Sequence, residues 1–315
     1  MIIPAFNSAD YLREAVGSAL SQSVPPSEII VIDDGSTDNI CDVIGEYGDS
    51  VRYFRQVNSG PAVARNRGIV EARGELIAFL DADDVWTTDK LERQLSFARQ
   101  NPDARLIHTA YREFDSDLDE LGPPRVLSAE TLQDGRIASG DYYGRLFRNN
   151  IIIMSTVMVY KRTLEDAGGF DETIRRPSTE DYDLWLRLSR HHKFGYLESP
   201  LTYYRRHSSN ATNDCGAIRE NELYVIRKAV MSDPSLEGRI GKRAIADRLF
   251  ELHYELGYRA HDVNNQRLAR NRLLNALRYR PWDRYTWCLM VANCLPERAF
   301  RLARGLKQSL EGVKV

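Results

Sequence analysis

The sequence predicts an α/β fold: a mainly parallel sheet flanked by helices, with an α-helical appendage at the C-terminus. In the first half of the chain, short apolar runs typical of buried strands alternate with helical patterns, as in βαβ units. From Ala217 onward the apolar spacing is helical almost throughout. We therefore predict two domains, residues 1–212 and residues 213–315.

The composition is that of an ordinary globular protein. Hydrophobic residues make up 43% and charged residues 28% of the 315 positions. The net charge of −2 does not suggest a nucleic-acid partner. Charge is unevenly distributed, because residues 264–315 contain eleven Lys and Arg against three Asp and Glu. Four scattered cysteines, with no Cys-x-x-Cys pair, favour free thiols in a reducing compartment such as the cytoplasm.

The first predicted elements follow one another in order. They are a strand at 2–4, a helix capped by residues 7–8 and running to about 21, strands at 29–32 and 51–54, a helix starting at 60–61, and a strand at 76–80. Because a buried strand rarely begins at an initiator Met, we also expect the native chain to start upstream of Met1.

Three carboxylates follow the strand at 76–80: Asp81, Asp83 and Asp84. Like charges this close repel one another, so the cluster is costly unless a cation neutralises it. Oxygen ligands suit Mg²⁺ or Mn²⁺, which also accept phosphate oxygens. The alternative for an Asp-x-Asp alone is a solvated loop that caps the next helix.

A second acidic pair, Asp33 and Asp34, follows the strand at 29–32. In a parallel sheet the two acidic clusters lie at the same edge, where ligands bind in open α/β sheets. The first cluster can accept hydrogen bonds from a nucleoside base, and the second can hold a metal on its diphosphate. Arg65, on the intervening helix, can reach phosphate, although a solvated helix face explains it equally well.

The middle of the chain continues with mixed patterns. We predict a helix from Asp89 to about 99, a strand at 106–111, a loop-dominated insertion at 112–140, a long β-prone run at 151–160, a turn at 168–171, a helix at 179–188, and strands at 194–197 and 201–207. Glu180 and Asp181 fall in the first helical turn, where the helix dipole favours negative charge. Capping is therefore the alternative to a catalytic role for both.

Seven segments in this order resemble the inverting family 2 glycosyltransferases, which have the Rossmann-like GT-A nucleotide-diphospho-sugar transferase fold. They are IIPAFN at 2–7, IDDGSTD at 32–38, ARNRGI at 64–69, FLDADD at 79–84, GGFDE at 168–172, EDYDLWLR at 180–187 and YRRH at 204–207. Each is weak alone, but together they span residues 1–210 in register. The Gln-x-x-Arg-Trp motif of processive members is absent, which implies one sugar per transfer event.

The resemblance implies a role for each matching residue. The nucleoside pocket would be lined by Pro4, Ala5, Phe6 and Asn7, and Asp34 would accept a hydrogen bond from the base. The donor would contact Arg65, Asp81 and Ala82, and Mg²⁺ or Mn²⁺ would be held by Asp81, Asp83 and His207. The general base would be Asp181, with Glu180 as a second catalytic candidate. The implied reaction moves one sugar from a nucleotide-diphospho-sugar, by default UDP-linked, to a hydroxyl of a glycan or lipid-linked acceptor.

Two alternatives belong to other functional classes. The first is a haloacid-dehalogenase-like phosphatase with Asp81 as nucleophile, because residues 80–85 also fit an apolar strand followed by Asp-x-Asp-x-Val. In that class the signature follows the first strand, whereas here it follows three βα units. The second is a binding module without turnover, which the presence of both Asp83 and Asp181 disfavours.

The C-terminal region contains one unit in tetratricopeptide register, with Gly257, Leu273 and Pro281 among its matching positions, which predicts a helical hairpin. Residues 296–310 are amphipathic with a basic polar side. We favour a packed helix there, and the alternative is peripheral contact with the inner face of a membrane. No apolar run approaches the roughly 18 residues that span a bilayer.

Overall fold

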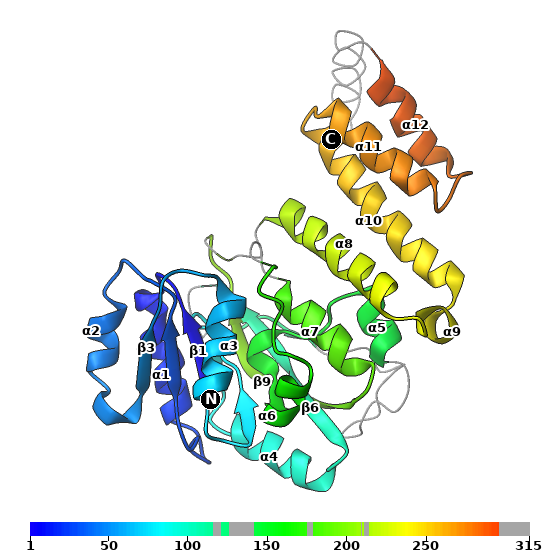
Figure 1. The fold of residues 1–315 in the computed structure, drawn as a ribbon. Coiled ribbons are helices and arrows are strands. Elements are labelled where there is room, and N and C mark those ends of the chain that lie inside the picture. Colours follow the sequence, from blue (N-terminus) through cyan, green and yellow to red (C-terminus); the bar gives the residue numbers. More distant parts are fainter. Residues whose placement is uncertain (116–120, 126–141, 175–178, 209, 211–213, 296–315) are drawn as a thin grey trace. The chain divides into compact units, whose positions relative to one another are not determined.

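The computed structural model describes residues 1–115, 121–125, 142–174, 179–208, 210 and 214–295 (Figure 1). The chain divides into two compact units, Met1–Asn213 and Asp214–Val315, and each is described by itself. The predicted segment at 296–310 lies outside the described residues.

The first unit begins with three parallel strands, β1 (Ile2–Ala5), β2 (Ile30–Asp33) and β3 (Arg52–Arg55), in the order β1-β2-β3. On the other side of β1, Ile2 forms a parallel bridge with Phe79, and the N–H of Leu80 donates to the Ile2 carbonyl at 3.1 Å. The chain after β4 (Leu76–Ala78) therefore extends the sheet, which gives the 3-2-1-4 order of a Rossmann-like half.

Beyond β4 the sheet becomes mixed. Its order is β4-β8-β6-β9-β5, with β8 at Met158–Tyr160, β6 at Ala104–Phe114, β9 at Lys193–Arg205, β5 at Val85–Trp86, and β7 (Pro124–Arg125) pairing with β6. Among the described strands of this part, β6 and β9 pair in parallel and the other pairs are antiparallel. The predicted α/β class is confirmed, and its continuous parallel part is the edge formed by β1, β2, β3 and the end of β4.

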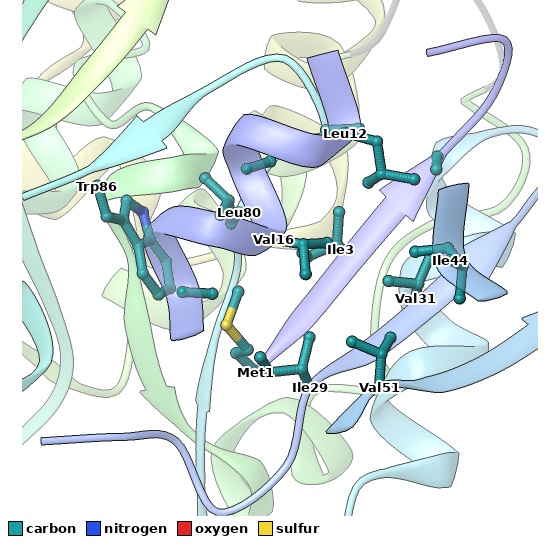
Figure 2. Close-up of a cluster of buried hydrophobic side chains, with 14 of the residues drawn as sticks. Met1, Ile3, Leu12, Val16, Ile29, Val31, Ile44, Val51, Leu80 and Trp86 are labelled. Carbon is teal, nitrogen blue, oxygen red and sulfur yellow. The ribbon is translucent and has the colours of Figure 1, made fainter. Parts of the chain in front are cut away.

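Side-chain alternation along β1 places helices on both faces of this sheet. Ile3 packs in one buried cluster with Leu12 and Val16 of α1 (Ala9–Leu20) and Ile44 of α2 (Ile40–Gly45), as Figure 2 shows. Ile2 points to the other face, toward α3 (Pro61–Glu71). A Cβ atom on Gly68 would lie only 2.5 Å from Cγ2 of Ile2, so the close contact of α3 requires glycine there.

The other helices of the first unit are α4 (Lys90–Gln100), α5 (Tyr142–Arg148), α6 (Lys161–Asp166) and α7 (Glu180–Ser189), with short 3-10 turns at Gly48–Ser50 and Met154–Thr156. The β-prone run at 151–160 contains a strand only at its end. The Thr156 hydroxyl donates to the Ile153 carbonyl at 2.6 Å, which closes a turn and leaves only Met158–Tyr160 extended. The two strands predicted at 194–207 are the single strand β9.

The described part of the second unit contains helices α8 (Cys215–Ser232), α9 (Leu236–Ile240), α10 (Lys242–Asp262), α11 (Gln266–Leu277) and α12 (Arg284–Cys294). The predicted hairpin is formed by α10 and α11. At their contact a Cβ on Gly257 would lie 2.8 Å from Cδ2 of Leu273, which is fully buried. Within the described part of the chain, no helix combines the length and apolarity needed to cross a bilayer.

Candidate functional site

The loops after β1 and β2 are joined by hydrogen bonds. Asn7 adopts a positive φ of 48°, donates its N–H to Oγ of Ser36 at 3.0 Å and accepts the N–H of Thr37 at 2.8 Å. Oδ2 of Asp38 accepts the N–H of Ala9 at 2.9 Å. The sequence predicted a cap from residues 7–8, but the Ser8 side chain makes no capping bond, and this distant carboxylate takes that role.

The predicted nucleoside-pocket residues differ in exposure. Phe6 is 43% exposed and Asn7 is exposed, so both can meet a ligand. Pro4 is half-buried, whereas the Ala5 side chain belongs to the core cluster beneath the sheet edge. A ligand could therefore meet Ala5 only through its backbone. The Ala5 carbonyl also accepts the N–H of Asp34 at 2.8 Å, which joins the ends of β1 and β2.

Asp34 and Asp33 hold the loops at this edge. Oδ1 of Asp34 accepts the Ser59 N–H at 2.9 Å and the Gln56 side-chain amide, and Oδ2 accepts the Gly60 N–H at 2.7 Å. One acceptor position therefore remains at Oδ2. Asp33 is buried; burial alone would raise its pKa, but hydrogen bonds from Ser36 and Tyr53 outweigh this and lower the pKa.

The acidic cluster after β4 is partly buried. The Asp81 N–H donates to Oγ of Ser155 at 3.0 Å. Burial and then the charge of Asp81 raise the pKa of Asp83, and burial and the two other carboxylates raise the pKa of Asp84 well above its usual value. The mutual repulsion expected from the sequence is therefore present in the fold. Ala82, between the first two carboxylates, is itself buried.

The end of β9 holds this cluster from the other side. The Arg205 backbone N–H donates to Oδ1 of Asp84 at 2.9 Å, and its Nε donates to the Asp83 carbonyl at 2.9 Å. Its guanidinium also pairs with Glu14 of α1 at 2.7 Å. His207, two residues on, places Nε2 3.0 Å from Oδ2 of Asp83. Sequence reasoning missed Arg205, although it lies inside the YRRH segment.

The side-chain atoms near Asp83 are of the types that bind a divalent ion, whose remaining coordination positions substrate oxygens would fill. Nε2 of His207 and Oδ2 of Asp83 are in hydrogen-bond contact at 3.0 Å, and an imidazole nitrogen and a carboxylate oxygen are both ligand types found in metal sites. One oxygen of the third carboxylate, Oδ1 of Asp81, is paired with Arg65. Over the described residues, no group of three or more His, Cys, Asp or Glu side chains is already assembled for a metal.

Arg65 joins this cluster to α7. Its Nη2 lies 2.7 Å from Oδ1 of Asp81, and its Nη1 pairs with Oε1 of Glu180. The Arg65 guanidinium also lies 5.8 Å from the Phe170 ring centroid. Burial alone would lower the pKa of Arg65, but the two carboxylates outweigh burial and raise it. Arg65, which the sequence predicted to contact the donor, thus connects the acidic loop after β4 with the first turn of α7.

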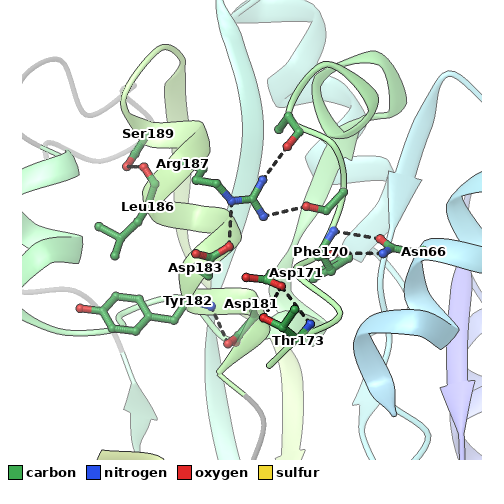
Figure 3. A network of polar contacts seen from close by, with 12 residues as sticks. Asn66, Phe170, Asp171, Thr173, Asp181, Tyr182, Asp183, Leu186, Arg187 and Ser189 are labelled. Atoms are coloured by element: carbon green, nitrogen blue, oxygen red, sulfur yellow. Dashed lines mark hydrogen bonds and ion pairs between the residues drawn. The ribbon is translucent and has the colours of Figure 1, made fainter. Parts of the chain in front are cut away.

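Asp181 follows Glu180 in the first turn of α7 (Figure 3). Its Oδ1 accepts the Tyr182 N–H at 2.6 Å, and its Oδ2 lies 3.4 Å from Nδ2 of Asn150. Burial and then the charge of Glu180 raise the pKa of Asp181 to about 7. The helix dipole favours the ionised carboxylate, but burial has the larger effect on this pKa.

The GGFDE segment supports both α3 and α7. Asn66 of α3 donates to the Phe170 carbonyl at 3.0 Å and accepts the Phe170 N–H at 2.8 Å. Arg187 of α7 pairs with Asp183 at 2.8 Å and donates to the carbonyls of Ala167 and Gly169, as Figure 3 shows. These contacts fix the first turn of α7 relative to α3.

Comparison with known proteins decides the family. The profile described as Glycosyl transferase family 2 matches residues 1–167, more than half of the chain. The chain is a family 2 glycosyltransferase. It is 45% identical over 237 residues to the putative teichuronic acid biosynthesis glycosyltransferase TuaG of Bacillus subtilis, with 72% of this chain and 86% of that relative covered.

Other relatives are longer than this glycosyltransferase. It is 32% identical over 245 residues to an uncharacterized glycosyltransferase of Rickettsia felis, which covers 73% of this chain but only 39% of the relative. The chain thus spans well under half of that protein. None of these relationships supports the phosphatase alternative, and the transferase reading of the FLDADD segment replaces it.

Solved structures confirm the GT-A fold of this glycosyltransferase. The crystal structure of TarS from S. aureus matches 92% of this chain and 54% of its own, with a TM-score of 0.64 and 18% identity. TarS 1–349 in complex with UDP matches with a TM-score of 0.61 over 93% of this chain and 87% of its own, also at 18% identity. The mannosyltransferase PcManGT from Pyrobaculum calidifontis, in complex with GDP-Man and Mn²⁺, matches 98% of this chain and 79% of its own, with a TM-score of 0.59 and 16% identity.

Proposed function

We propose that this glycosyltransferase moves one sugar from a nucleotide-diphospho-sugar to a hydroxyl of a glycan or lipid-linked acceptor, with inversion at the anomeric carbon and with Mg²⁺ or Mn²⁺ bound. The observation that carries the proposal is the double contact of Arg65. Because it touches Asp81 and Glu180, the donor-side acidic loop and the first turn of α7 belong to one site.

The donor side would be formed by the loops after β1, β2 and β4. The exposed Phe6 ring offers a surface for a base, and Oδ2 of Asp34 retains an acceptor position for a base N–H. We propose uridine as the base, because similar structures contain UDP or UDP-GlcNAc, although another contains GDP-Man.

The metal would be held by Asp83 and His207, with the free oxygen of Asp81 as a third ligand. Mg²⁺-type ions are commonly held by one or two carboxylates and completed by substrate phosphates, which suits this small donor set. When bound, the ion would neutralise charge that develops on the departing diphosphate.

Asp181 would act on the acceptor. In its ionised form it takes the proton of the acceptor hydroxyl while that oxygen bonds to the anomeric carbon. The bond from the anomeric carbon to the diphosphate oxygen breaks, and its electron pair leaves with the nucleoside diphosphate. Attack from the face opposite the leaving group inverts the configuration. A pKa of about 7 gives Asp181 a large ionised fraction near neutral pH together with useful basicity.

The cellular setting follows from a relative and from charge. TuaG is named for teichuronic acid biosynthesis, so we propose an acceptor in cell-envelope polysaccharide synthesis. Residues 1–212 would be the catalytic domain in the cytoplasm. The basic residues of the segment 264–315 would give peripheral contact with anionic lipid at the inner face of the membrane.

A thermal-shift panel tests the donor proposal, because a ligand that binds the native state raises its apparent stability. UDP-, GDP- and dTDP-sugars should be compared with Mn²⁺ and with EDTA. We expect one nucleotide class to raise Tm strongly, and only with metal. Proton NMR of the product then reports the anomeric configuration: a retained configuration would contradict the single-displacement mechanism.

A further inference from the structure

Arg65 is the centre of a buried ion network that spans three elements. It lies on α3, while Asp81 follows β4 and Glu180 begins α7, 115 residues further along the chain. Arg65 and Glu180 are both almost fully buried. Burying such charges is costly, and replacing a buried ion pair by apolar residues is often neutral or stabilising. Stability alone therefore gives little reason for this network.

The hydrogen bonding of the pair is incomplete. Among the described residues, Nε of Arg65 and Oε2 of Glu180 find no hydrogen-bond partner. A network built only for stability would satisfy such buried atoms. What the network does provide is geometry, because the planar fork of an arginine fixes two carboxylates relative to each other in a way that a lysine cannot.

The pair also sets the electrostatic surroundings of Asp181. Glu180 raises the pKa of Asp181, and Arg65 acts in the opposite direction. From the α5 side, the chain presents the neutral amide of Asn150. On α7 itself, the next carboxylate, Asp183, is paired with Arg187. Among the described residues, the charge balance at Asp181 therefore rests mainly on Arg65 and Glu180.

We propose that Arg65 and Glu180 are a positioning pair that holds the first turn of α7, with Asp181, in register with the Asp81 loop. The inference rests on the proposed function, because it assigns Asp181 to the acceptor and Asp81 to the donor. The pair acts through these two residues: it aligns the base with the donor carbon and keeps the base in the basicity range that transfer needs.

The test compares Arg65→Lys, Glu180→Gln and the double variant Arg65→Gln/Glu180→Gln with wild type. Arg67→Lys is the matched control, because Arg67 lies on the same helix but donates to the Arg55 carbonyl in an exposed position. Each protein is assayed for transfer between pH 5.5 and 9, for UDP affinity by calorimetry and for Tm. ¹³C NMR follows the titration of the Asp181 carboxyl without requiring turnover.

We expect Arg65→Lys to lose about 10²-fold in kcat/KM, the size typical of a small misplacement of reacting groups, while Arg67→Lys stays at the wild-type level. Glu180→Gln should move both the acidic limb of the transfer profile and the Asp181 titration to lower pH, because it removes a facing negative charge. The double variant keeps a neutral hydrogen-bonded pair and should lose less than the product of the single losses.

The inference is overturned if Arg65→Lys and Glu180→Gln transfer at the rate of Arg67→Lys. It is also overturned if their losses merely follow Tm while the Asp181 titration stays unchanged, because that result describes a structural role only. Absence of transfer in the wild-type protein would instead refute the proposed function, and the NMR titration would still decide whether Glu180 acts on Asp181.

Discussion

His207 Nε2 lies 3.0 Å from Oδ2 of Asp83, although 124 residues separate the two in sequence. The pair brings the YRRH segment at the end of β9 onto the acidic loop after β4. Tyr11 of α1 stacks on the His207 ring at a centroid distance of 4.8 Å, and this contact restricts the orientation of the imidazole. This arrangement presents one nitrogen and one carboxylate oxygen side by side.

The first prediction concerns metal and nucleotide. Nucleoside diphosphate should bind much more tightly with Mn²⁺ or Mg²⁺ than with EDTA, and Asp83→Ala should abolish that difference in titration calorimetry. His207→Gln should reduce it, because one ligand is lost. The exposed Asp103→Ala is the control, since Asp103 pairs only with Lys193 in the described structure. Equal affinity with and without metal in the wild-type protein would refute the metal site.

The second prediction concerns the general base. Asp181→Asn should fold and bind donor nucleotide normally but lose transfer by about 10²–10⁴-fold, because the amide oxygen cannot take the proton. In the wild type, kcat/KM should rise with pH through about 7, where Asp181 ionises. Asp81→Asn should be assayed in parallel for phosphate release as well as for transfer. If Asp181→Asn keeps full glycosyl-transfer activity, the general base is not Asp181, and Glu180 or Asp183 becomes the next candidate.

The third prediction links the same carboxyl to stability. Its pKa is raised from 3.8 in a model peptide to about 7 in the fold. Between these values the folded state binds more protons than the unfolded state, so this group's contribution to stability falls as pH rises from about 4 to 7. Asparagine does not titrate. The Tm of Asp181→Asn minus that of wild type should therefore be larger at pH 8 than at pH 4, with Asp103→Asn as the control for loss of charge.

The fourth prediction uses two helical glycines. Gly68→Ala would place a Cβ 2.5 Å from Ile2, a fully buried side chain, and should destabilise the protein by about 1–3 kcal/mol. Gly17→Ala, inside α1 with nothing within 4 Å of the added Cβ, should stabilise it by about 0.5–1 kcal/mol. Denaturant unfolding measures both. Equal effects of the two substitutions would contradict the close contact between α3 and β1.

The fifth prediction concerns lipid. Deletion of residues 282–315 should leave nucleotide binding intact but reduce sedimentation with anionic liposomes, because this basic region supplies the attraction. A finer test reverses two exposed charges, Arg278→Glu and Arg284→Glu, against a matched control at Lys242 and Arg243 of α10. Unchanged liposome binding by the deletion variant would favour a packed C-terminal helix without membrane contact.

Local patterns in the sequence predicted most elements of the fold. The apolar runs of β1, β2 and β3 and the Gly60-Pro61 start of α3 are short-range signals, and the structure has these elements where they were expected. The β-prone run at 151–160 forms a strand only at Met158–Tyr160, because β-propensity reports a fit to a half-buried surface and not a fixed backbone conformation. Within the run, the Thr156 hydroxyl donates to the Ile153 carbonyl in a turn.

The candidate site likewise has features that the sequence predicts and features that only the tertiary structure shows. By itself the sequence predicted where the acidic side chains lie, because acidic residues placed directly after strands gather at one edge of a parallel sheet. It also determined that the carboxylates Asp81, Asp83 and Asp84 would repel one another.

Only the tertiary structure decided their partners and their protonation. Arg65 meets Glu180, and Asp83 meets His207, across more than a hundred residues. Burial and the charge of Glu180 raise the pKa of Asp181. The sequence shows Glu180 as its direct neighbour, but the burial has no local signal. The physical reason is that desolvation and charge pairing depend on distance in space, which the chain sets only once its sheet and helices have packed.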